Sequence, residues 1–268
     1  MVRVREEIAT GGVWARLEPL IPVPDRRFRY PDRKHADDRA AREGVLHVVR
    51  TGIGWNRLPK ALFGASGATC WRWLTEWREA GVWQQLHEQL LVEVRAAGLL
   101  DLSAAAVDAT PLSVQGGNTG PSPVDRRKLG CTHHLITDAH GTPLTVTIAG
   151  RHHNDVTQLI PLIEAIPPMR GTVGKPRRRP LRLHVDRGYD HDKYRHLVRD
   201  HGIIPMTARR GAEHGSGLRT ISWPVVRTAA WLKGFRRRRI RTELRADVHQ
   251  AIISLACSVI CLRILILN

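Results

Sequence analysis

Two aspartates at the ends of short apolar runs are the residues best suited to do chemistry. Asp108 closes the run Ala-Ala-Ala-Val-Asp, and Asp186 closes Leu-His-Val-Asp. Strands that end in a carboxylate aim it at one edge of a sheet, where ligands bind in open α/β folds. If the two strands are neighbours, the paired negative charges need a cation or a shared proton. The alternative is that both aspartates only cap unrelated loops.

The charge of the chain indicates which metal and which substrate such a site would serve. Lys and Arg number 42 against 25 Asp and Glu, which gives a net charge of +17. A charge this positive repels itself and implies a polyanionic partner, with nucleic acid the first candidate and an anionic membrane surface the second. Mg²⁺, or Mn²⁺ in its place, is commonly held by one or two carboxylates together with phosphate oxygens. In a two-metal site the ions activate a water and stabilise the leaving oxygen of a phosphoryl transfer.

Basic residues gather in two places that could contact phosphates. Arg126, Arg127 and Lys128 follow the first strand, and Arg236, Arg237, Arg238 and Arg239 are consecutive near the C-terminal end. On a helix four consecutive arginines point in all directions, so some of them must reach solvent, and the arginine fork suits phosphate oxygens. We therefore predict DNA contacts for both clusters, and the alternative is a solvated surface without a ligand.

Several other classes of protein lack support in the sequence. The most apolar stretch, residues 251–262, is followed by Arg263 and is short of the ~20 residues that span a bilayer, so we expect a buried helix and no membrane contact. No signal peptide is visible, and the four cysteines form no C-x-x-C pair, which fits a reducing cytoplasm. The pairs His133/His134 and His152/His153 are poor metal sites because adjacent strand residues point to opposite faces.

The first hundred residues predict short helices. Asp37 can cap a helix that runs through Val49 and stops at Gly52, Ser66 can cap a second, and a third begins near Gly81. Six of the eight tryptophans lie in this region and would form a dense core. Short helices joined by turns suit a helix-turn-helix-like DNA-binding module, and the alternative is a helical bundle used only for packing.

Beyond Leu100 the pattern changes to alternating strands and helices. Strands are expected at 104–108, on both sides of the turn at 138–141, at 181–185 and at 203–206, and helices after Asn154 or Asp155, at 193–200 and from Pro224. The order β, β, β, α, β, α, β, α indicates an α/β domain. We therefore divide the chain into a helical domain, 1–100, and a catalytic domain, 101–268.

Several motifs in register carry a resemblance. The segments VDATPLSVQGG, NDVTQL, HVDRGYDHDKYR and WPVVRTAAWLKGFRRRRIR resemble insertion-sequence transposases of the DDE class, and RTGIGWNRLPKALFGASGATCWRWLTEW resembles their DNA-binding half. The match runs in order from about Trp14 to Arg263. It implies a ribonuclease-H-like mixed sheet flanked by helices, preceded by a small all-helical DNA-binding domain.

The resemblance also implies an activity, partners and a location. It implies metal-dependent cleavage of double-stranded DNA at the terminal repeats of an element, transfer of the freed 3′-OH to a target, and a homodimer or larger synaptic complex in the cytoplasm, associated with the nucleoid. It makes Asp108 and Asp186 the first two metal-binding and catalytic acids.

The third acid of the resembled family is absent. The family places a glutamate where this chain has Val226, within Trp-Pro-Val-Val-Arg-Thr. Glu243 would be roughly 25 Å away along a continuous helix, which is too far for a shared metal. Glu213 is the other acid near the motif.

Three hypotheses follow. The protein is an active transposase, or a catalytically defective DNA-binding derivative that occupies element ends as a repressor, or a metal-dependent nuclease that does not join strands.

Overall fold

The computed structural model describes residues 11–23, 37–114, 119–123, 126–170, 176–207, 218–238 and 240–268. The first part of the chain is helical, as predicted. Residues 11–17 are helical and lead into η1 (Glu18–Leu20), after which come α2 (Asp38–Thr51), η2 (Trp55–Arg57), α3 (Lys60–Phe63), α4 (Gly67–Glu79) and α5 (Val82–Ala96).

The ends of these helices follow the capping residues in the sequence. The Asp37 side chain accepts a hydrogen bond from the Arg39 backbone N–H, and α2 stops at Gly52, whose φ of 75° is left-handed. The Ser66 hydroxyl accepts from the Thr69 N–H at the start of α4. These contacts confirm both predicted starts and the predicted stop.

A mixed sheet forms the second part of the chain. Its strands are β1 (Ala104–Val114), β2 (Gly120–Pro121), β3 (Leu129–Asp138), β4 (Pro143–Gly150), β5 (Arg182–Val185), β6 (Ile204–Thr207) and β7 (Ile240–Arg241). The main path runs β2-β3-β1-β5-β6, with β4 paired to β3 and β7 paired to β1. The β1–β3 and β3–β4 pairs are antiparallel, whereas β1–β5 and β5–β6 are parallel. Strands β1 and β3 both extend beyond the apolar runs predicted, because their antiparallel ladder continues past Asp108 as far as the pair Ser113 and Gly130.

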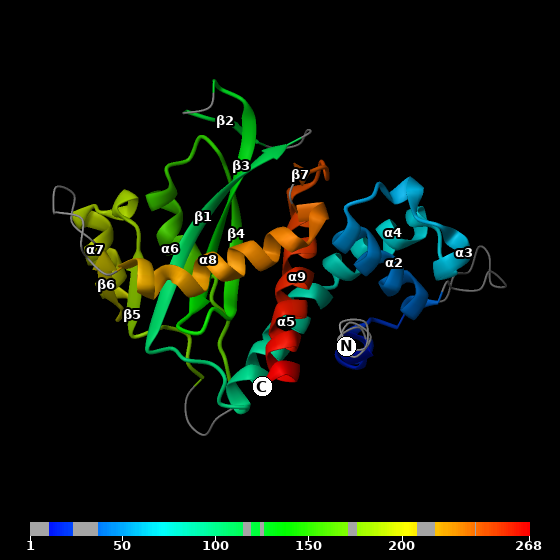
Figure 1. The fold of residues 1–268 in the computed structure, drawn as a ribbon, viewed down its shortest axis with the longest axis horizontal. Helices are drawn as coiled ribbons and strands as arrows, with labels where there is room; N and C mark the ends of the chain where they lie inside the picture. Colours follow the sequence, from blue (N-terminus) through cyan, green and yellow to red (C-terminus); the bar gives the residue numbers. More distant parts are fainter. Residues whose placement is uncertain are drawn as a thin grey trace.

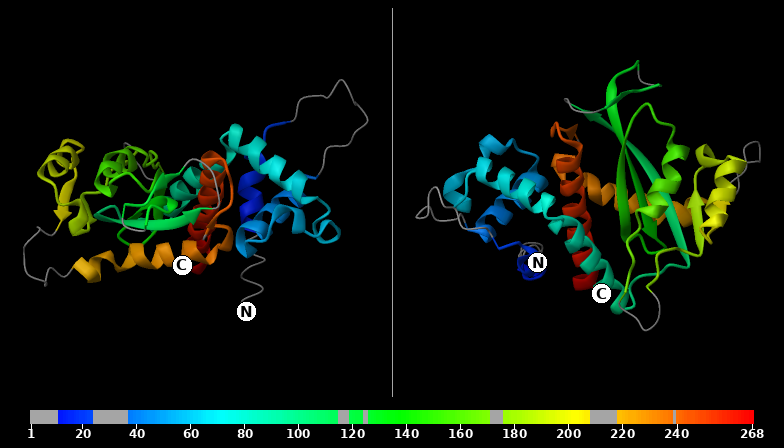
Figure 2. Two further views of the ribbon diagram at one scale, coloured as in Figure 1. Left: turned by 90° about the horizontal axis from the view of Figure 1, so that it is seen from above. Right: turned by 180° about the vertical axis from the view of Figure 1, so that it is seen from behind.

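Helices lie on both sides of this sheet. η3 (Asp155–Gln158), α6 (Leu159–Glu164), η4 (Arg187–Tyr189) and α7 (Asp192–Asp200) follow the strands in the predicted order. Figure 2 shows α6 and α7 on one side of the sheet and α8 (Leu218–Gly234) on the other. The prediction that this helix begins at Pro224 was wrong. Pro224 lies inside α8, where its missing N–H removes one hydrogen bond without ending the helix.

The last helix, α9 (Ala246–Leu267), follows η5 (Arg236–Arg238) and joins the two parts of the chain. It packs along α5 on one side and against β4 on another, and Figure 1 shows α5 and α9 side by side. Its length and composition would allow it to cross a membrane, but 67% of its apolar window is buried within the protein. The predicted buried helix is therefore confirmed, and its role here is to bridge α5 and the sheet.

A buried histidine links α5 to the sheet and gives the fold an expected pH dependence. His87 is buried on α5, and its Nε2–H donates to the Pro143 carbonyl at 2.9 Å. Burial lowers its pKa from 6.5 to about 4, although the Pro143 carbonyl acts in the opposite direction. Because the unfolded chain binds this proton and the folded chain does not, stability is lost as the pH falls from about 6.5 through 4.

We expect the His87→Gln variant to lose stability less steeply than the wild type over this pH interval. Between pH 7 and 4 the wild type should lose roughly 3 kcal/mol more unfolding free energy than the His87→Gln variant loses. Urea unfolding at a series of pH values would measure it, with the exposed His196→Gln as the matched control. Parallel slopes for wild type and His87→Gln would contradict the role of this histidine.

Candidate active site

The pairing of β1 with β5 brings the two predicted aspartates together. Ala104 pairs with Arg182 and Ala106 with His184, which is the last pair of the parallel ladder. The same offset, continued for two residues beyond that pair, would set Asp108 opposite Asp186, which directly follows β5 and precedes η4. Neighbouring strands in a sheet are about 4.8 Å apart. The backbone register therefore explains why two carboxylates remote in sequence share one location.

The surroundings of the two carboxylates favour a cation between them. Asp108 is half-buried and accepts a hydrogen bond of 2.8 Å from the Thr110 hydroxyl. The pKa of Asp186 is raised by partial burial and by the negative charge of Asp108. Two carboxylates that repel each other in this way would be stabilised by a cation bound between them.

Two further residues that sequence reasoning did not assign to the site face the same carboxylates. The Tyr189 side chain on η4 is buried, and its hydroxyl has no hydrogen-bond partner among the described residues. Burial raises the pKa of Tyr189, and the charges of Asp155, Asp108 and Asp186 raise it further. Its position three residues after Asp186 in the Asp-Arg-Gly-Tyr motif was the only signal in the sequence.

Asp155 is the second of these residues, and of the two residues expected to begin this helix it is the other one, Asn154, that forms the cap. The Asn154 side chain caps η3 by accepting from the Val156 N–H. The Asp155 carboxylate instead lies 3.9 Å from Nε2 of His134, and η3 packs against η4. Partial burial raises the pKa of Asp155, with a contribution from Asp108. Burial lowers the pKa of His134 to about 4, so this ring is neutral at pH 7.

The donor set fits a hard divalent cation that shares its coordination with substrate. Within the described parts of the chain, no three His, Cys, Asp or Glu side chains are grouped closely enough to enclose a metal alone. Mg²⁺ does not need such a group, because it is typically held by one or two carboxylates while water and substrate phosphates fill the other positions. Asp108 and Asp186 are two carboxylates that could form such a pair.

The position of the absent third acid lies on α8. Val226 is 55% exposed, whereas its neighbour Val225 is buried. Successive helix residues differ by about 100°, so Val226 projects from a different flank of α8 than Arg227 does. The sequence of α8 contains no acidic residue.

Glu243 does not replace the third acid. The sequence predicted that distance along one continuous helix would exclude it, but the structure gives a different reason. The helix does not continue to Glu243, because α8 ends at Gly234. Glu243 is buried, and its Oε1 accepts from Nε of Arg237 at 2.7 Å. It is therefore engaged in the interior of the protein. Glu213 lies outside the described residues.

The structure separates the members of the C-terminal arginine cluster. Its expected helix is replaced by the short turn η5, in which Arg236 is exposed and Arg237 is buried. Arg237 departs from the predicted DNA-binding role because its guanidinium pairs with Glu243 and donates to the Ile53 carbonyl. The side chain of Arg238, and Arg239 as a whole, lie outside the described residues.

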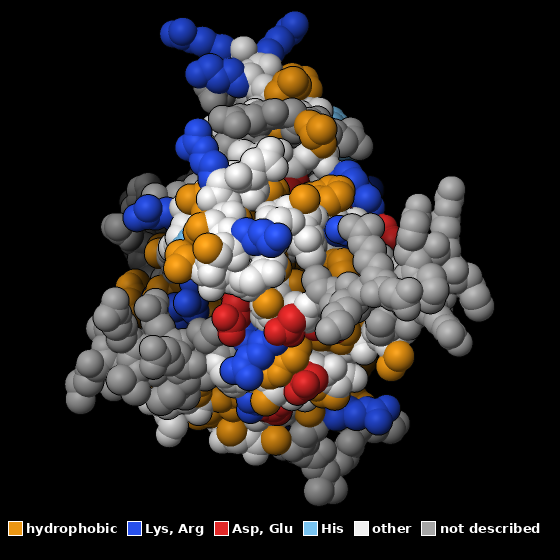
Figure 3. Space-filling model, turned by 90° about the vertical axis from the view of Figure 1, so that its right-hand side faces the viewer, with side chains coloured by type: hydrophobic (Ala, Val, Ile, Leu, Met, Phe, Trp, Pro, Cys, Tyr) orange, Lys and Arg blue, Asp and Glu red, His pale blue; other side chains and the backbone are white. Residues whose placement is uncertain are grey.

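The other basic cluster is at the turn that leads into β3. Arg126, Arg127 and Lys128 are exposed, and the first two have left-handed φ angles of 45° and 57°. Lys and Arg side chains project from the tip of the molecule where Figure 1 places the β2–β3 arm (Figure 3). This arrangement presents positive charge well away from the body of the sheet.

Comparison with known proteins identifies the family. The family model described as "Transposase DDE domain" matches residues 100–261, and that described as "Putative transposase of IS4/5 family" matches residues 10–87. The chain belongs to the DDE transposases of insertion sequences. The DDE domain implies that the mixed sheet is ribonuclease-H-like, as the sequence predicted, that the reaction is nucleotidyl transfer and that the partner of this transposase is DNA.

Two relatives from Burkholderia cepacia are similar to this transposase. The "Putative transposase for insertion sequence element IS402" is 54% identical over 143 residues, which cover 53% of this chain and 68% of the relative. The "Insertion element IS402 uncharacterized 16.2 kDa protein" is 42% identical over 127 residues, which cover 47% of this chain and 81% of the relative.

Proposed function

We propose that this transposase cuts DNA at the ends of its own element and joins the freed 3′-OH to a target, with Asp108 and Asp186 holding Mg²⁺ or Mn²⁺. The observation that carries the proposal is the β1–β5 register, because the offset of its last pair, Ala106 with His184, directs Asp108 and Asp186 to the same end of the parallel ladder. The mutual repulsion of their charges supports it.

Each residue around the site has a defined part in this proposal. A bound divalent ion would activate the attacking water and stabilise the leaving oxygen. The Thr110 hydroxyl fixes one oxygen of Asp108, which leaves the other oxygen for the ion. The Tyr189 hydroxyl has no hydrogen-bond partner in the part of the chain that the structure describes, so it is available to donate to a carboxylate or phosphate oxygen.

DNA binding in this proposal combines two surfaces. The basic residues proposed to contact phosphates are Arg126, Arg127, Lys128 and Arg236, together with Arg238 and Arg239, which are included from the sequence alone. The N-terminal helices, with the exposed Arg72 on α4, recognise the terminal repeats as a helix-turn-helix-like module. Because two element ends must be held together, the working form is a homodimer or larger complex on DNA, within the nucleoid.

A second candidate function is a DNA-binding derivative with weak cleavage, which would act as a repressor at element ends. The observation that favours it is Val226, an exposed apolar side chain where the family has a glutamate, on a helix that contains no acid. Asp108 and Asp186 could still hold one ion, whereas a second ion would lack the carboxylate that the glutamate would supply.

The Val226→Glu variant tests which of the two functions applies. If the missing acid limits catalysis, we expect this variant to nick DNA carrying the terminal repeats at least about tenfold faster in Mg²⁺ or Mn²⁺. The Val226→Gln variant, of similar shape and without the charge, should stay at the wild-type rate. Equal turnover by the wild type and Val226→Glu would reject the defective-copy hypothesis, and detection of joined products would exclude a simple nuclease.

A further inference from the structure

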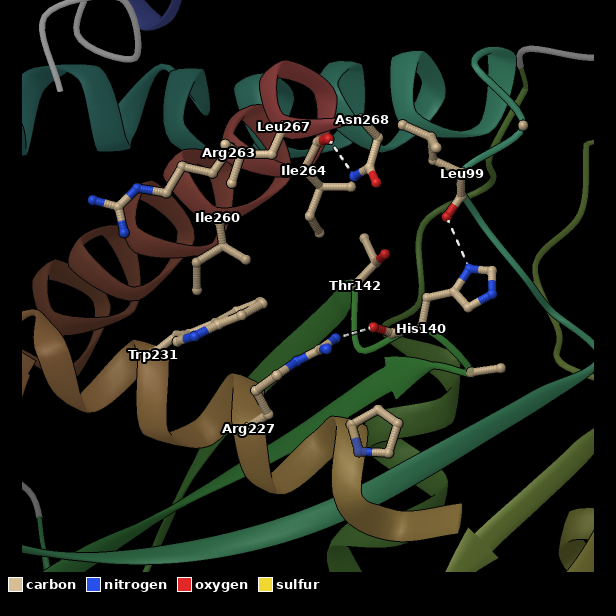
Figure 4. A pocket seen from close by; sticks show the side chains of 13 residues that line it. Leu99, His140, Thr142, Arg227, Trp231, Ile260, Arg263, Ile264, Leu267 and Asn268 are labelled. Atoms are coloured by element: carbon tan, nitrogen blue, oxygen red, sulfur yellow. Dashed lines mark hydrogen bonds between the residues drawn. The ribbon is translucent and has the colours of Figure 1, made fainter. Parts of the chain in front are cut away.

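A cavity of about 680 Å³ lies between α8, α9 and the turn that joins β3 to β4. Its lining includes Leu99, His140, Arg227, Trp231, Arg263 and Ile264 (Figure 4). The lining turn lies beside the segment that precedes β1, because the Ala139 N–H donates to the Asp101 carbonyl, whereas Asp108 lies roughly 13 Å beyond the first residue of β1 at about 3.3 Å per residue. The cavity is therefore separate from the pair of carboxylates.

One wall of the cavity is a stacked aromatic and cationic group on α8. The guanidinium carbon of Arg227 lies 4.8 Å from the ring centroid of Trp223 and 4.6 Å from that of Trp231. One guanidinium nitrogen donates to the His140 carbonyl, and the Arg227 Nε is buried without a hydrogen-bond partner among the residues that the structure describes. The Trp231 side chain remains 42% exposed. Arg227 is thus held in place while part of the indole ring stays open.

The opposite wall is apolar and carries a second cation. Ile260 and Ile264 face the cavity from α9, as Figure 4 shows. Arg263, which stands between these two isoleucines in the sequence, is half-buried. Within the described part of the chain its guanidinium has no hydrogen-bond or ion-pair partner. The cavity lining contains two arginines and no acidic residue. Its occupant should therefore be anionic and should also present a flat apolar surface.

We propose that this cavity binds one unpaired nucleotide of a DNA strand, with its base against Trp231 and the isoleucines of α9 and its phosphate at Arg263. Stacking on aromatic rings combined with cations that follow the backbone is the general way in which proteins hold single strands, and it tolerates any base. A fully paired duplex offers no free base to enter. This inference rests on the proposed function in one respect, which is that the polyanion bound by the protein is DNA.

The test compares two DNA ligands that differ only in an unpaired extension. Fluorescence anisotropy would measure the affinity of the full chain for a blunt duplex and for the same duplex with a short single-stranded overhang. We expect Trp231→Ala and Arg263→Ala each to weaken binding of the overhang duplex about tenfold, and to leave binding of the blunt duplex within about twofold. Arg199→Ala, which removes an exposed arginine on α7, is the matched control.

Every other outcome overturns this inference. Unchanged affinity of both variants for the overhang would mean that the cavity does not hold a nucleotide and serves another partner. Equal losses for both ligands would mean a general phosphate contact. Wild-type affinity for thymidine monophosphate equal to that for the overhang would assign the cavity to free nucleotides. Arg263→Ala is expected to fold normally, because the Arg263 guanidinium has no partner among the described residues whose loss could destabilise the protein. Failure of the wild type to bind the blunt duplex would count against the proposed function.

Discussion

Replacement of either Asp108 or Asp186 by asparagine is expected to reduce metal-dependent DNA cleavage by roughly a thousandfold, while binding of duplex DNA is retained. A metal ion bound at a reacting phosphate supplies several kcal/mol of transition-state stabilisation, and each 1.36 kcal/mol lost is a factor of ten in rate. Asparagine keeps the shape of the side chain but removes the charge that attracts the ion. A nicking assay with element ends, run beside an electrophoretic binding assay, would measure both quantities.

The matched control for these variants is Asp200→Asn. Asp200 is an exposed aspartate at the end of α7, and its replacement removes the same charge at a distance from the site. It should cleave like the wild type. Cleavage by Asp108→Asn or Asp186→Asn at the rate of this control would show that the two carboxylates do not hold a required ion. Loss of binding together with cleavage would instead indicate a damaged fold.

The second large effect is expected for stability. The Arg237→Ala variant should lose about 3–5 kcal/mol of unfolding free energy, because removal of one partner leaves a buried charge without its counterion. The Arg237–Glu243 pair is 9% and 3% exposed, with 2.7 Å between Nε and Oε1. Burial alone would raise the pKa of Glu243, but His249 and Arg237 together lower it, so the carboxylate depends on these partners.

Arg237 also connects the N-terminal helices to the second part of the chain. It donates to the Ile53 carbonyl at 3.1 Å, and its guanidinium carbon lies 5.7 Å from the centre of the Trp55 ring. Glu243 in turn lies near His249 on α9, whose Nε2 is 3.1 Å from that of His133 on β3. This buried network therefore holds η2, α9 and the sheet in one arrangement.

Two further variants make the stability prediction specific. Arg237→Met combined with Glu243→Leu removes both charges and should recover most of the stability that Arg237→Ala loses, since apolar residues of similar volume often replace a buried ion pair. The exposed neighbour Arg236→Ala should stay within about 0.5 kcal/mol of the wild type in urea unfolding, while weakening DNA binding. A loss below about 1 kcal/mol for Arg237→Ala would contradict the structural role of this pair.

The sequence predicted well what depends on local chemistry. Asp37, Gly52 and Ser66 act through backbone groups only a few residues away, so their helix ends could be recognised directly. The pairing of Asp108 with Asp186 was also accessible, because each aspartate follows an apolar run that is typical of a buried strand. Here a local pattern and a single assumption about neighbouring strands were sufficient.

The features that the sequence did not reveal depend on tertiary contacts. Nothing local distinguishes Arg237 from Arg236, and only the approach of Ile53 and Glu243 makes one of them buried. Tyr189 and Asp155 join the site because η4, which follows β5, packs against η3, which follows β4. Such contacts join residues that are far apart in the sequence, so no local pattern reveals them.

Anomalous X-ray diffraction from crystals soaked in MnCl₂ would test the metal-site claim most directly. The proposed function predicts a manganese peak in contact with the carboxylates of both Asp108 and Asp186, and the disappearance of that peak in Asp186→Asn crystals. A manganese peak elsewhere in a protein that still cleaves DNA, with these two carboxylates unliganded, would contradict it.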